Sequence, residues 1–284
     1  MLEETDNLRP PPSYFIYQAE ASMRKRAADV WNHCSNATEV SKYPAVENDY
    51  IVTLNSTNYA YYPIAKCGWT TWTYVMFDAA GKPEEPNEKG FHIGWMSPFM
   101  HAGMQKVRRK MSIIRQYKER LLFVRDPYDR LVSAYKNKVL YGPYYLTYHT
   151  PCRWSKKGMD PPTFPQFVRC ILEAAKGTGE KTLSSRRVAQ ALDIHWKPQY
   201  WSSLPCATNY TLIGKFEHLE EDISQTISIL HLNASIPHKN ASKKAKNETL
   251  AYWYNQVPIE DKRALQELYR FDFDIFNFND TIPA

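Results

Sequence analysis

The stretch RLLFVRDPYDRLVSAYKNKVL, residues 120–140, decides the fold. Residues 121–124 form a short, fully apolar run, which is typical of a strand buried in a parallel sheet. A helix start follows at once, because Asp126 can cap a helix, Pro127 suits its first position and Asp129 falls in its first turn. The stretch therefore predicts a buried strand that leads directly into a helix ending near Leu140.

A second strand and helix meet in AYYPIAKCGWTTWTYVM, residues 60–76. The loop between them holds Lys66, Cys67, Gly68, Trp69, Thr70 and Thr71. A turn from a strand into a helix points backbone N–H groups at an anion, and a lysine adds a positive charge. The loop lacks the second glycine and the G-K-[ST] ending of a nucleoside-triphosphate loop, which disfavours ATP or GTP hydrolysis. The alternative is an ordinary strand-to-helix turn.

Strands and helices alternate along the rest of the chain. Residues 1–18 indicate an extended surface leader, and residues 271–278 an aromatic tail that packs on the core. The fold class is α/β, with a P-loop-like, mainly parallel central sheet flanked by helices. Further strands are expected at residues 50–54, 59–64 and 212–214, and further helices at residues 19–34, 99–118, 164–175, 219–232 and 259–269.

The first stretch also carries a candidate anion site. Arg125 stands at the carboxyl end of the predicted strand, where open α/β sheets bind ligands. Arg130 and Ser133 are three residues apart and share a helix face, so a guanidinium and a hydroxyl can converge on one phosphate. A structural ion pair is the alternative for Arg130.

Together the two stretches resemble the two nucleotide-binding motifs of the sulfotransferase superfamily. FVRDPYDRLVSAY is similar to the F-V-R-x-P-F-x-R-L-x-S-A-Y motif of the HNK-1, chondroitin and dermatan sulfotransferases. In the first motif, Ala65 and Trp69 stand where that family usually has Pro and Cys. The resemblance covers residues 59–278 and extends to DIHWKPQ (193–199), LIGKFEHLEED (212–222) and LYRFDFDIFNF (268–278).

This resemblance implies the sulfotransferase fold and a reaction. The donor would be 3′-phosphoadenosine-5′-phosphosulfate (PAPS), the acceptor a hydroxyl of a glycan, and no metal would be needed. Lys66 would neutralise the leaving 5′-phosphate, and Arg125 and Ser133 would hold the 3′-phosphate. The domain organisation would be a leader and helix at residues 1–45 and one catalytic domain at residues 46–284. The other residues expected at the 5′-phosphosulfate are Cys67, Gly68, Trp69, Thr70 and Thr71.

A general base must take the proton of the acceptor hydroxyl, and histidine is the usual choice. His92 lies in a region where related sulfotransferases carry their base, and His195 lies in the HWKPQ segment. Glu217 and the other histidines stay open as alternatives. The side chains of Trp196, Lys197 and Tyr200 could line an acceptor groove, although aromatic residues are more commonly buried in a core.

The net charge of +6 favours anionic partners, and the basic clusters are short and dispersed. The sequence contains no nucleic-acid recognition motif. Two competing functions remain: a non-catalytic protein that binds acidic glycans, and a nucleotide-dependent kinase. The sequence lacks the Walker residues and the acidic Mg²⁺-binding motif that a kinase would need, which disfavours that function.

The location is expected to be the Golgi lumen. Acceptors for N-linked glycans occur at Asn36, Asn55, Asn209, Asn233, Asn240, Asn247 and Asn279. The sequence has no apolar run that could span a bilayer, so we expect a type II membrane anchor that is absent from this chain. Of the five cysteines, Cys67 is expected to be free, with disulfides among Cys152, Cys170 and Cys206.

Overall fold

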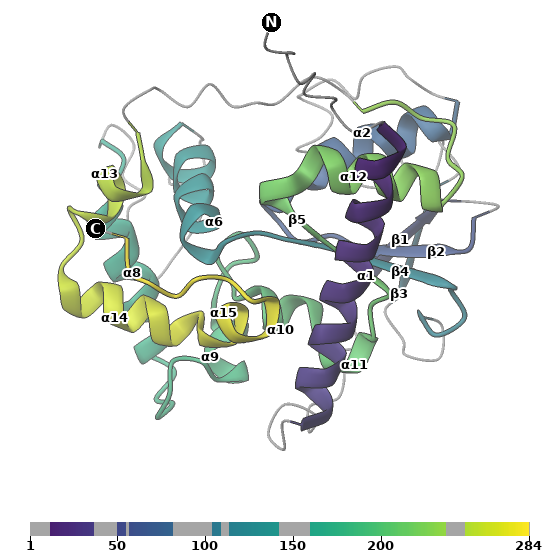
Figure 1. The fold of residues 1–284 in the computed structure, drawn as a ribbon. Helices are drawn as coiled ribbons and strands as arrows, with labels where there is room; N and C mark the ends of the chain where they lie inside the picture. The colour runs from purple at the N-terminus through teal and green to yellow at the C-terminus, as the bar shows by residue number, and fades with distance from the viewer. Residues whose placement is uncertain are drawn as a thin grey trace, which may run out of the picture.

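One mixed sheet runs through the centre of the protein (Figure 1). We describe the chain from a computed structural model, over residues 12–36, 50–54, 57–81, 104–108, 114–141, 160–236 and 248–283. Within these residues the strand order is β3-β1-β2-β4-β5. The strands are β1 Tyr50–Leu54, β2 Tyr59–Tyr62, β3 Met104–Arg108, β4 Glu119–Val124 and β5 Leu212–Lys215.

The parallel part of the sheet contains the two stretches on which the fold prediction depends. β4 pairs in parallel with β2 on one side and with β5 on the other, whereas β1 pairs antiparallel with β2 and β3. Leu121, Leu122, Phe123 and Val124 are fully buried, as expected for a central parallel strand. The α/β fold with a mainly parallel sheet is thus confirmed.

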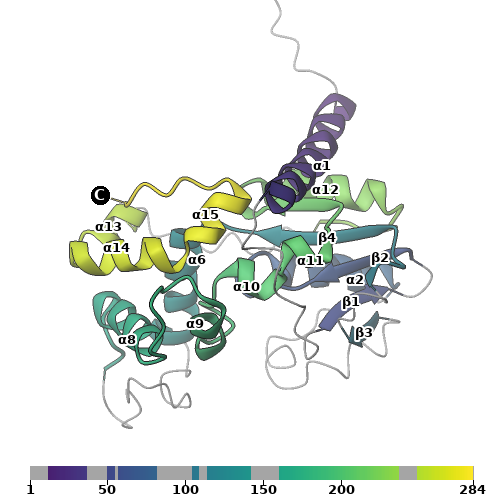
Figure 2. The ribbon, with the colours of Figure 1, turned by 90° about the horizontal axis from the view of Figure 1, so that it is seen from below.

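Helices cover both faces of the sheet (Figures 1 and 2). α2 and α12 lie on one face, and α10 and α11 lie on the other. The first turns of α2 and α12 are close, because an added Cβ on Gly68 would come within 2.8 Å of the Leu219 side chain. The bounds are α2 Trp69–Ala79, α10 Gln199–Ser203, α11 Pro205–Thr208, η3 Phe216–His218 and α12 Leu219–Ile229.

A second hydrophobic core lies beyond the carboxyl ends of the parallel strands. Helix α6, which follows β4, packs there with α8, α13 and α14 on the left of Figure 1. Tyr128, Phe164, Trp253 and Tyr254 contact one another through aromatic rings in this core. The bounds are α6 Pro127–Ala134, η2 Tyr135–Leu140, α8 Phe164–Lys176, α9 Arg186–Ala191, α13 Leu250–Tyr254, α14 Ile259–Leu268 and α15 Arg270–Phe276.

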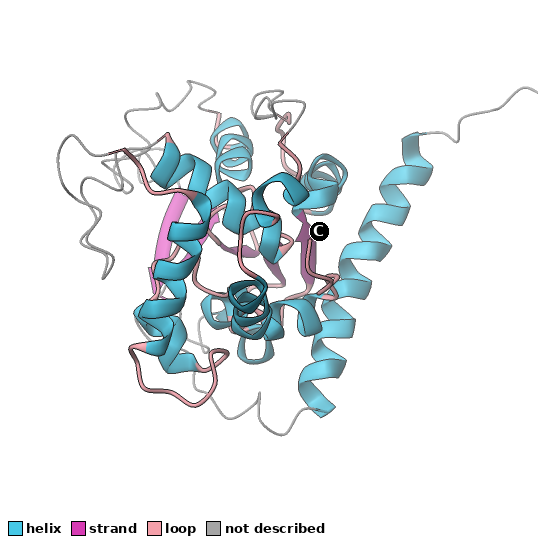
Figure 3. Cartoon of the chain, turned by 90° about the vertical axis from the view of Figure 1, so that its left-hand side faces the viewer, coloured by secondary structure: helices cyan, strands magenta, loops and turns pink. Residues whose placement is uncertain are grey.

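The long helix α1, Pro12–Asn36, runs past the β5 edge of the sheet and stands at the right of Figure 3. The Arg26 guanidinium donates to the Ile213 carbonyl at 2.7 Å and to both carboxylate oxygens of Asp222 at 2.7 Å. These bonds cover a carbonyl of an edge strand that would otherwise be open to pairing. No helix within the described ranges is long and apolar enough to cross a membrane.

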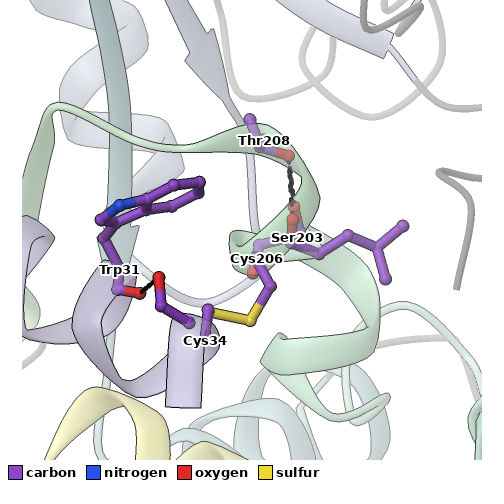
Figure 4. The surroundings of a disulfide bond; sticks show 7 residues. Trp31, Cys34, Ser203, Cys206 and Thr208 are labelled. Carbon is purple, nitrogen blue, oxygen red and sulfur yellow. Dashed lines mark hydrogen bonds between the residues drawn. A yellow bond between two sulfur atoms is a disulfide. The ribbon is translucent and has the colours of Figure 1, made fainter. Parts of the chain in front are cut away.

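A disulfide between Cys34 and Cys206 links the end of α1 to α11 (Figure 4). Cys170 is also disulfide-bonded, and Cys67 is free, as predicted. The expectation of disulfides among Cys152, Cys170 and Cys206 is wrong for Cys206. Its partner is Cys34, because α1 runs along the β5 edge to α11 and brings together two cysteines that are 172 residues apart in sequence.

Two element predictions are also wrong. Residues 104–108 form β3 rather than part of a helix, because they pair with β1 from Tyr50–Arg108 to Leu54–Met104. Pairing with a neighbouring strand thus outweighs the local helical periodicity. Helix α1 begins at Pro12, so residues 12–18 are not an extended leader. Proline suits the first turn of a helix, where its missing N–H leaves no bond unmade.

Candidate functional site

The loop between β2 and α2 has the backbone of an anion cradle. Lys66 and Gly68 both adopt left-handed conformations, with φ of 71° and 81°. Gly68 is the N-cap of α2, and no side chain caps that end of the helix. The first turn of α2 contains no acidic residue. Its first N–H groups and the positive end of its dipole can therefore receive an anion.

The side chains of this loop divide into buried and accessible ones. Thr70 is exposed, and Lys66, Thr71 and Trp69 are half-buried; the Trp69 ring stacks on Tyr61. The Cys67 thiol is fully buried 3.1 Å from the Gln199 Oε1, and burial raises its pKa to about 12. The thiol is therefore neutral and lies in the interior, so only the backbone of Cys67 can contribute to anion binding.

Lys66 lies among other cations. Burial, together with the positive charges of Arg125, Lys138 and Arg130, lowers its pKa to about 8. A polyanionic ligand would offset these repulsions. The concentration of positive charge therefore favours an anion at this position.

Arg125 joins the loop to the start of α6. Its Nη1 donates to the Lys66 carbonyl at 3.2 Å, while Nε and Nη2 donate to Asp129 at 2.9 and 2.5 Å. The guanidinium also lies 3.9 Å from the centre of the Phe216 ring. The two stretches recognised in the sequence thus meet at the carboxyl ends of β2 and β4.

Arg130 has a structural role. It is almost completely buried and donates to the carbonyls of Ala65 at 3.0 Å, Lys197 at 2.8 Å and Ile194 at 3.1 Å. The expected convergence of Arg130 with Ser133 on a phosphate is wrong, because the guanidinium is used by main-chain carbonyls. The alternative of an ion pair is wrong for the same reason. Ser133 is half-buried on α6.

Asp193 orients His195 in the turn before α10. The His195 Nδ1 lies 2.6 Å from the Asp193 Oδ1, and the His195 backbone N–H donates to the same oxygen at 2.9 Å. Burial lowers the pKa of His195, and the nearby carboxylate partly offsets this effect. An imidazole that donates its Nδ1 proton to a carboxylate carries its lone pair on Nε2, which suits a general base.

The other candidates differ in position. His92 lies outside the described residues. The Glu217 carboxylate accepts the Asp126 backbone N–H at 2.8 Å. Trp196 and Tyr200 are buried in the two cores, so the expectation that they line a groove is wrong for both. In the part of the chain that the structure describes, no cluster of His, Cys, Asp or Glu could hold a metal ion.

Sequence reasoning missed the residues that connect the site to the rest of the fold. The Gln199 amide donates to the Arg125 carbonyl and accepts its N–H, and Asp272 in turn accepts the backbone N–H groups of Gln199 and Tyr200. Lys138 is a third omission, since it acts electrostatically on Lys66 and on His195. The motif similarity around Gln199 was a signal, but it did not indicate which residue the side chain contacts.

Comparisons with known proteins show the family of this chain. A family model described as "Sulfotransferase family" matches residues 49–279. Carbohydrate sulfotransferase 11 of Mus musculus is 25% identical over 238 residues, which cover 78% of this chain and 64% of that protein. Carbohydrate sulfotransferase 12 of Xenopus laevis is 24% identical over 308 residues, covering 93% and 70%. Carbohydrate sulfotransferase 8 of Homo sapiens is 25% identical over 240 residues, covering 77% and 53%.

This chain thus spans less than two thirds of the mouse and human relatives. No solved structure matches it. The resemblance expected from the two stretches is nevertheless confirmed, because the matched segment includes both of them and most of the chain. On this evidence the chain belongs to the sulfotransferase family.

Proposed function

We propose that this protein transfers a sulfuryl group from PAPS to a hydroxyl of a glycan. The observation that carries the proposal is the hydrogen bond from the Arg125 guanidinium to the Lys66 carbonyl, which joins the two predicted anion sites. A bisphosphorylated adenosine needs two such sites at a fixed separation. The carbohydrate sulfotransferases among the similar proteins support a glycan as acceptor.

The donor would lie across the carboxyl ends of β2 and β4. Lys66 and the first turn of α2, with Thr70 and Thr71, would hold the 5′-phosphosulfate. Arg125 and Ser133 would hold the 3′-phosphate, and the backbone of Cys67, Gly68 and Trp69 would shape the cradle. Charge stabilisation of the leaving phosphate supplies much of the rate in such a transfer.

His195 would act as the general base. Its Nε2 would take the proton of the acceptor hydroxyl as the new S–O bond forms and the S–O bond to the 5′-phosphate breaks. The dyad with Asp193 supports this role because it fixes the tautomer that a base requires. His92 remains a candidate for the same role, and variants of the two histidines would separate them.

The site of action would be the Golgi lumen, and the protein a glycoprotein. Asn209, Asn233 and Asn279 are exposed in N-x-S/T sequences, which leaves them open to glycosylation. The disulfides at Cys34–Cys206 and at Cys170 are typical of an oxidising compartment. Treatment of secreted or Golgi-retained protein with an N-glycosidase should increase its electrophoretic mobility.

Transfer of labelled sulfate from PAPS to a panel of acceptors tests the function. The panel would hold desulfated glycosaminoglycans and glycoprotein glycans, with Lys66→Ala as the control. We expect label on at least one acceptor and loss of that label in the variant. Binding of glycans without transfer would instead support the non-catalytic function.

A thermal-shift measurement tests the donor independently. Adenosine 3′,5′-bisphosphate should raise the melting temperature far more than ATP with Mg²⁺, since the proposed site has two separate anion sites and no acidic metal-binding motif. Stronger stabilisation by ATP with Mg²⁺ would favour the kinase.

A further inference from the structure

Helix α6 continues into η2 in a π-helical form, from Tyr135 to Leu140. A π-helical turn is wider than an α-helical turn because its hydrogen bonds run over five residues, and such turns are frequent at functional sites. Lys138 follows Arg130 by eight positions in the sequence. Two turns of about four residues each, one α-helical and one wider, return the helix to the same face. Lys138 therefore lies on the face that presents Arg130.

The hydrogen bonds of Arg130 show which segments this helix face packs against. Its guanidinium donates to the carbonyls of Ala65 and Ile194 at 3.0 and 3.1 Å. These residues immediately precede Lys66 and His195 in the sequence. The helix face thus packs between the lysine loop and the turn that contains the Asp193–His195 dyad.

The charge of the Lys138 ammonium acts on both groups, in agreement with its place on this helix face. Its positive charge lowers the pKa of Lys66 and that of His195. Burial lowers the pKa of Lys138 itself, while the Asp193 carboxylate opposes that change. A half-buried lysine is thus held near the proposed leaving-group side and the proposed base.

We propose that Lys138 is a further catalytic residue, whose ammonium contacts the sulfuryl group while it passes from the donor to the acceptor. This inference rests on the proposed function. In an in-line transfer the sulfur lies between the leaving 5′-phosphate oxygen, near Lys66, and the attacking hydroxyl, near His195. A cation between these two groups can neutralise the sulfuryl oxygens and keeps its own proton throughout.

The position of Lys138 predicts a specific division of effects. Adenosine 3′,5′-bisphosphate has both phosphates of the donor but no sulfuryl group. Substitution of a residue that contacts only the sulfuryl group should therefore lower the rate of transfer and leave the affinity for this product unchanged. Substitution of a residue that binds either phosphate should lower the affinity for the product as well.

The test compares Lys138→Met with Lys136→Met. Lys136 lies in the same π-helical segment, but it forms an ion pair with Glu248 and faces the Trp253 ring, in the second core. Transfer from PAPS is measured as kcat, and binding of adenosine 3′,5′-bisphosphate by calorimetry. We expect Lys138→Met to lower kcat by about 10² or more, as for loss of one charge-stabilising donor, with unchanged product affinity. Lys136→Met should change neither, and Lys138→Arg should restore part of the rate.

Two results would overturn the inference while leaving the proposed function intact. One is wild-type kcat in Lys138→Met, and the other is a loss of product affinity in that variant that matches its loss of rate. Absence of transfer by the wild-type protein to every acceptor would overturn the proposed function, and this inference with it.

Discussion

The side chain of Gln199 pairs with both main-chain groups of Arg125. Its Nε2 donates to the Arg125 carbonyl at 2.7 Å, and its Oε1 accepts the Arg125 N–H at 2.9 Å. Asp272 in α15 accepts the backbone N–H groups of Gln199 and Tyr200 at 2.8 and 2.7 Å. The end of β4 is thus held in position by α10, which is in turn held by a helix near the carboxyl terminus.

Gln199→Leu should therefore destabilise the protein. The substitution leaves a buried N–H and a buried carbonyl of Arg125 without their partner, at a cost of about 1–3 kcal/mol for each group. Urea unfolding would measure the free energy of unfolding. Gln256→Leu is the matched control, because its amide also donates to a main-chain carbonyl but is exposed. Equal stabilities for the two variants would contradict this account.

Gly68→Ala should weaken both the fold and the anion cradle. The left-handed backbone costs a residue with a Cβ roughly 1–2 kcal/mol, and the new methyl group would lie 2.8 Å from Leu219. Gly81→Ala isolates the first effect, since Gly81 is also left-handed and has open space around it. Thermal unfolding should show a larger loss for Gly68→Ala than for Gly81→Ala. Measured in a Leu219→Ala background, the loss caused by Gly68→Ala should fall to that of Gly81→Ala, because the clash with the Leu219 side chain is gone.

Local sequence patterns predicted the central part of the fold. The apolar run before Arg125 and the Asp126-Pro127 helix start fix β4 and α6 through neighbouring residues alone, and Asp126 accepts the Asp129 N–H as a cap should. β3 was missed because its pairing with β1 decides its structure. The roles of Gln199 and Asp272 depend on contacts across more than 70 residues, which no local pattern contains.

Local patterns also predicted the two motifs of the candidate site, but not the contacts between them. Local patterns placed Lys66 and Arg125 at the ends of two predicted strands, and the structure shows that these strands are neighbours and that the two segments meet. The use of Arg130 by three carbonyls could not be foreseen, because a guanidinium suits a phosphate as well as it suits a set of carbonyls. Similarly, the π-helical turn that positions Lys138 leaves no mark in the hydrophobic periodicity.

Loss of the Cys34–Cys206 disulfide should lower the free energy of unfolding by about 2–4 kcal/mol, since the bond closes a long loop in the unfolded chain. Cys34→Ser, Cys206→Ser and the double variant should all lose a similar amount, because either change breaks the same bond. Urea unfolding without reductant keeps the disulfide at Cys170 intact. Additive losses in the double variant would show that the two cysteines contribute separately.

The affinity for adenosine 3′,5′-bisphosphate should fall as the pH rises above about 8. Burial and the neighbouring cations bring the pKa of Lys66 down to about 8, so the free protein loses this proton there. A bound polyanion favours the charged lysine, and the full affinity is therefore present below pH 8 and lost above it. The phosphates of the ligand are already ionised in this range, because their second pKa is about 6. Calorimetry from pH 7 to pH 10 should show the fall in the wild type, whereas Lys66→Arg should keep its affinity because arginine stays charged. A wild-type affinity that does not change over this range would remove Lys66 from the anion site.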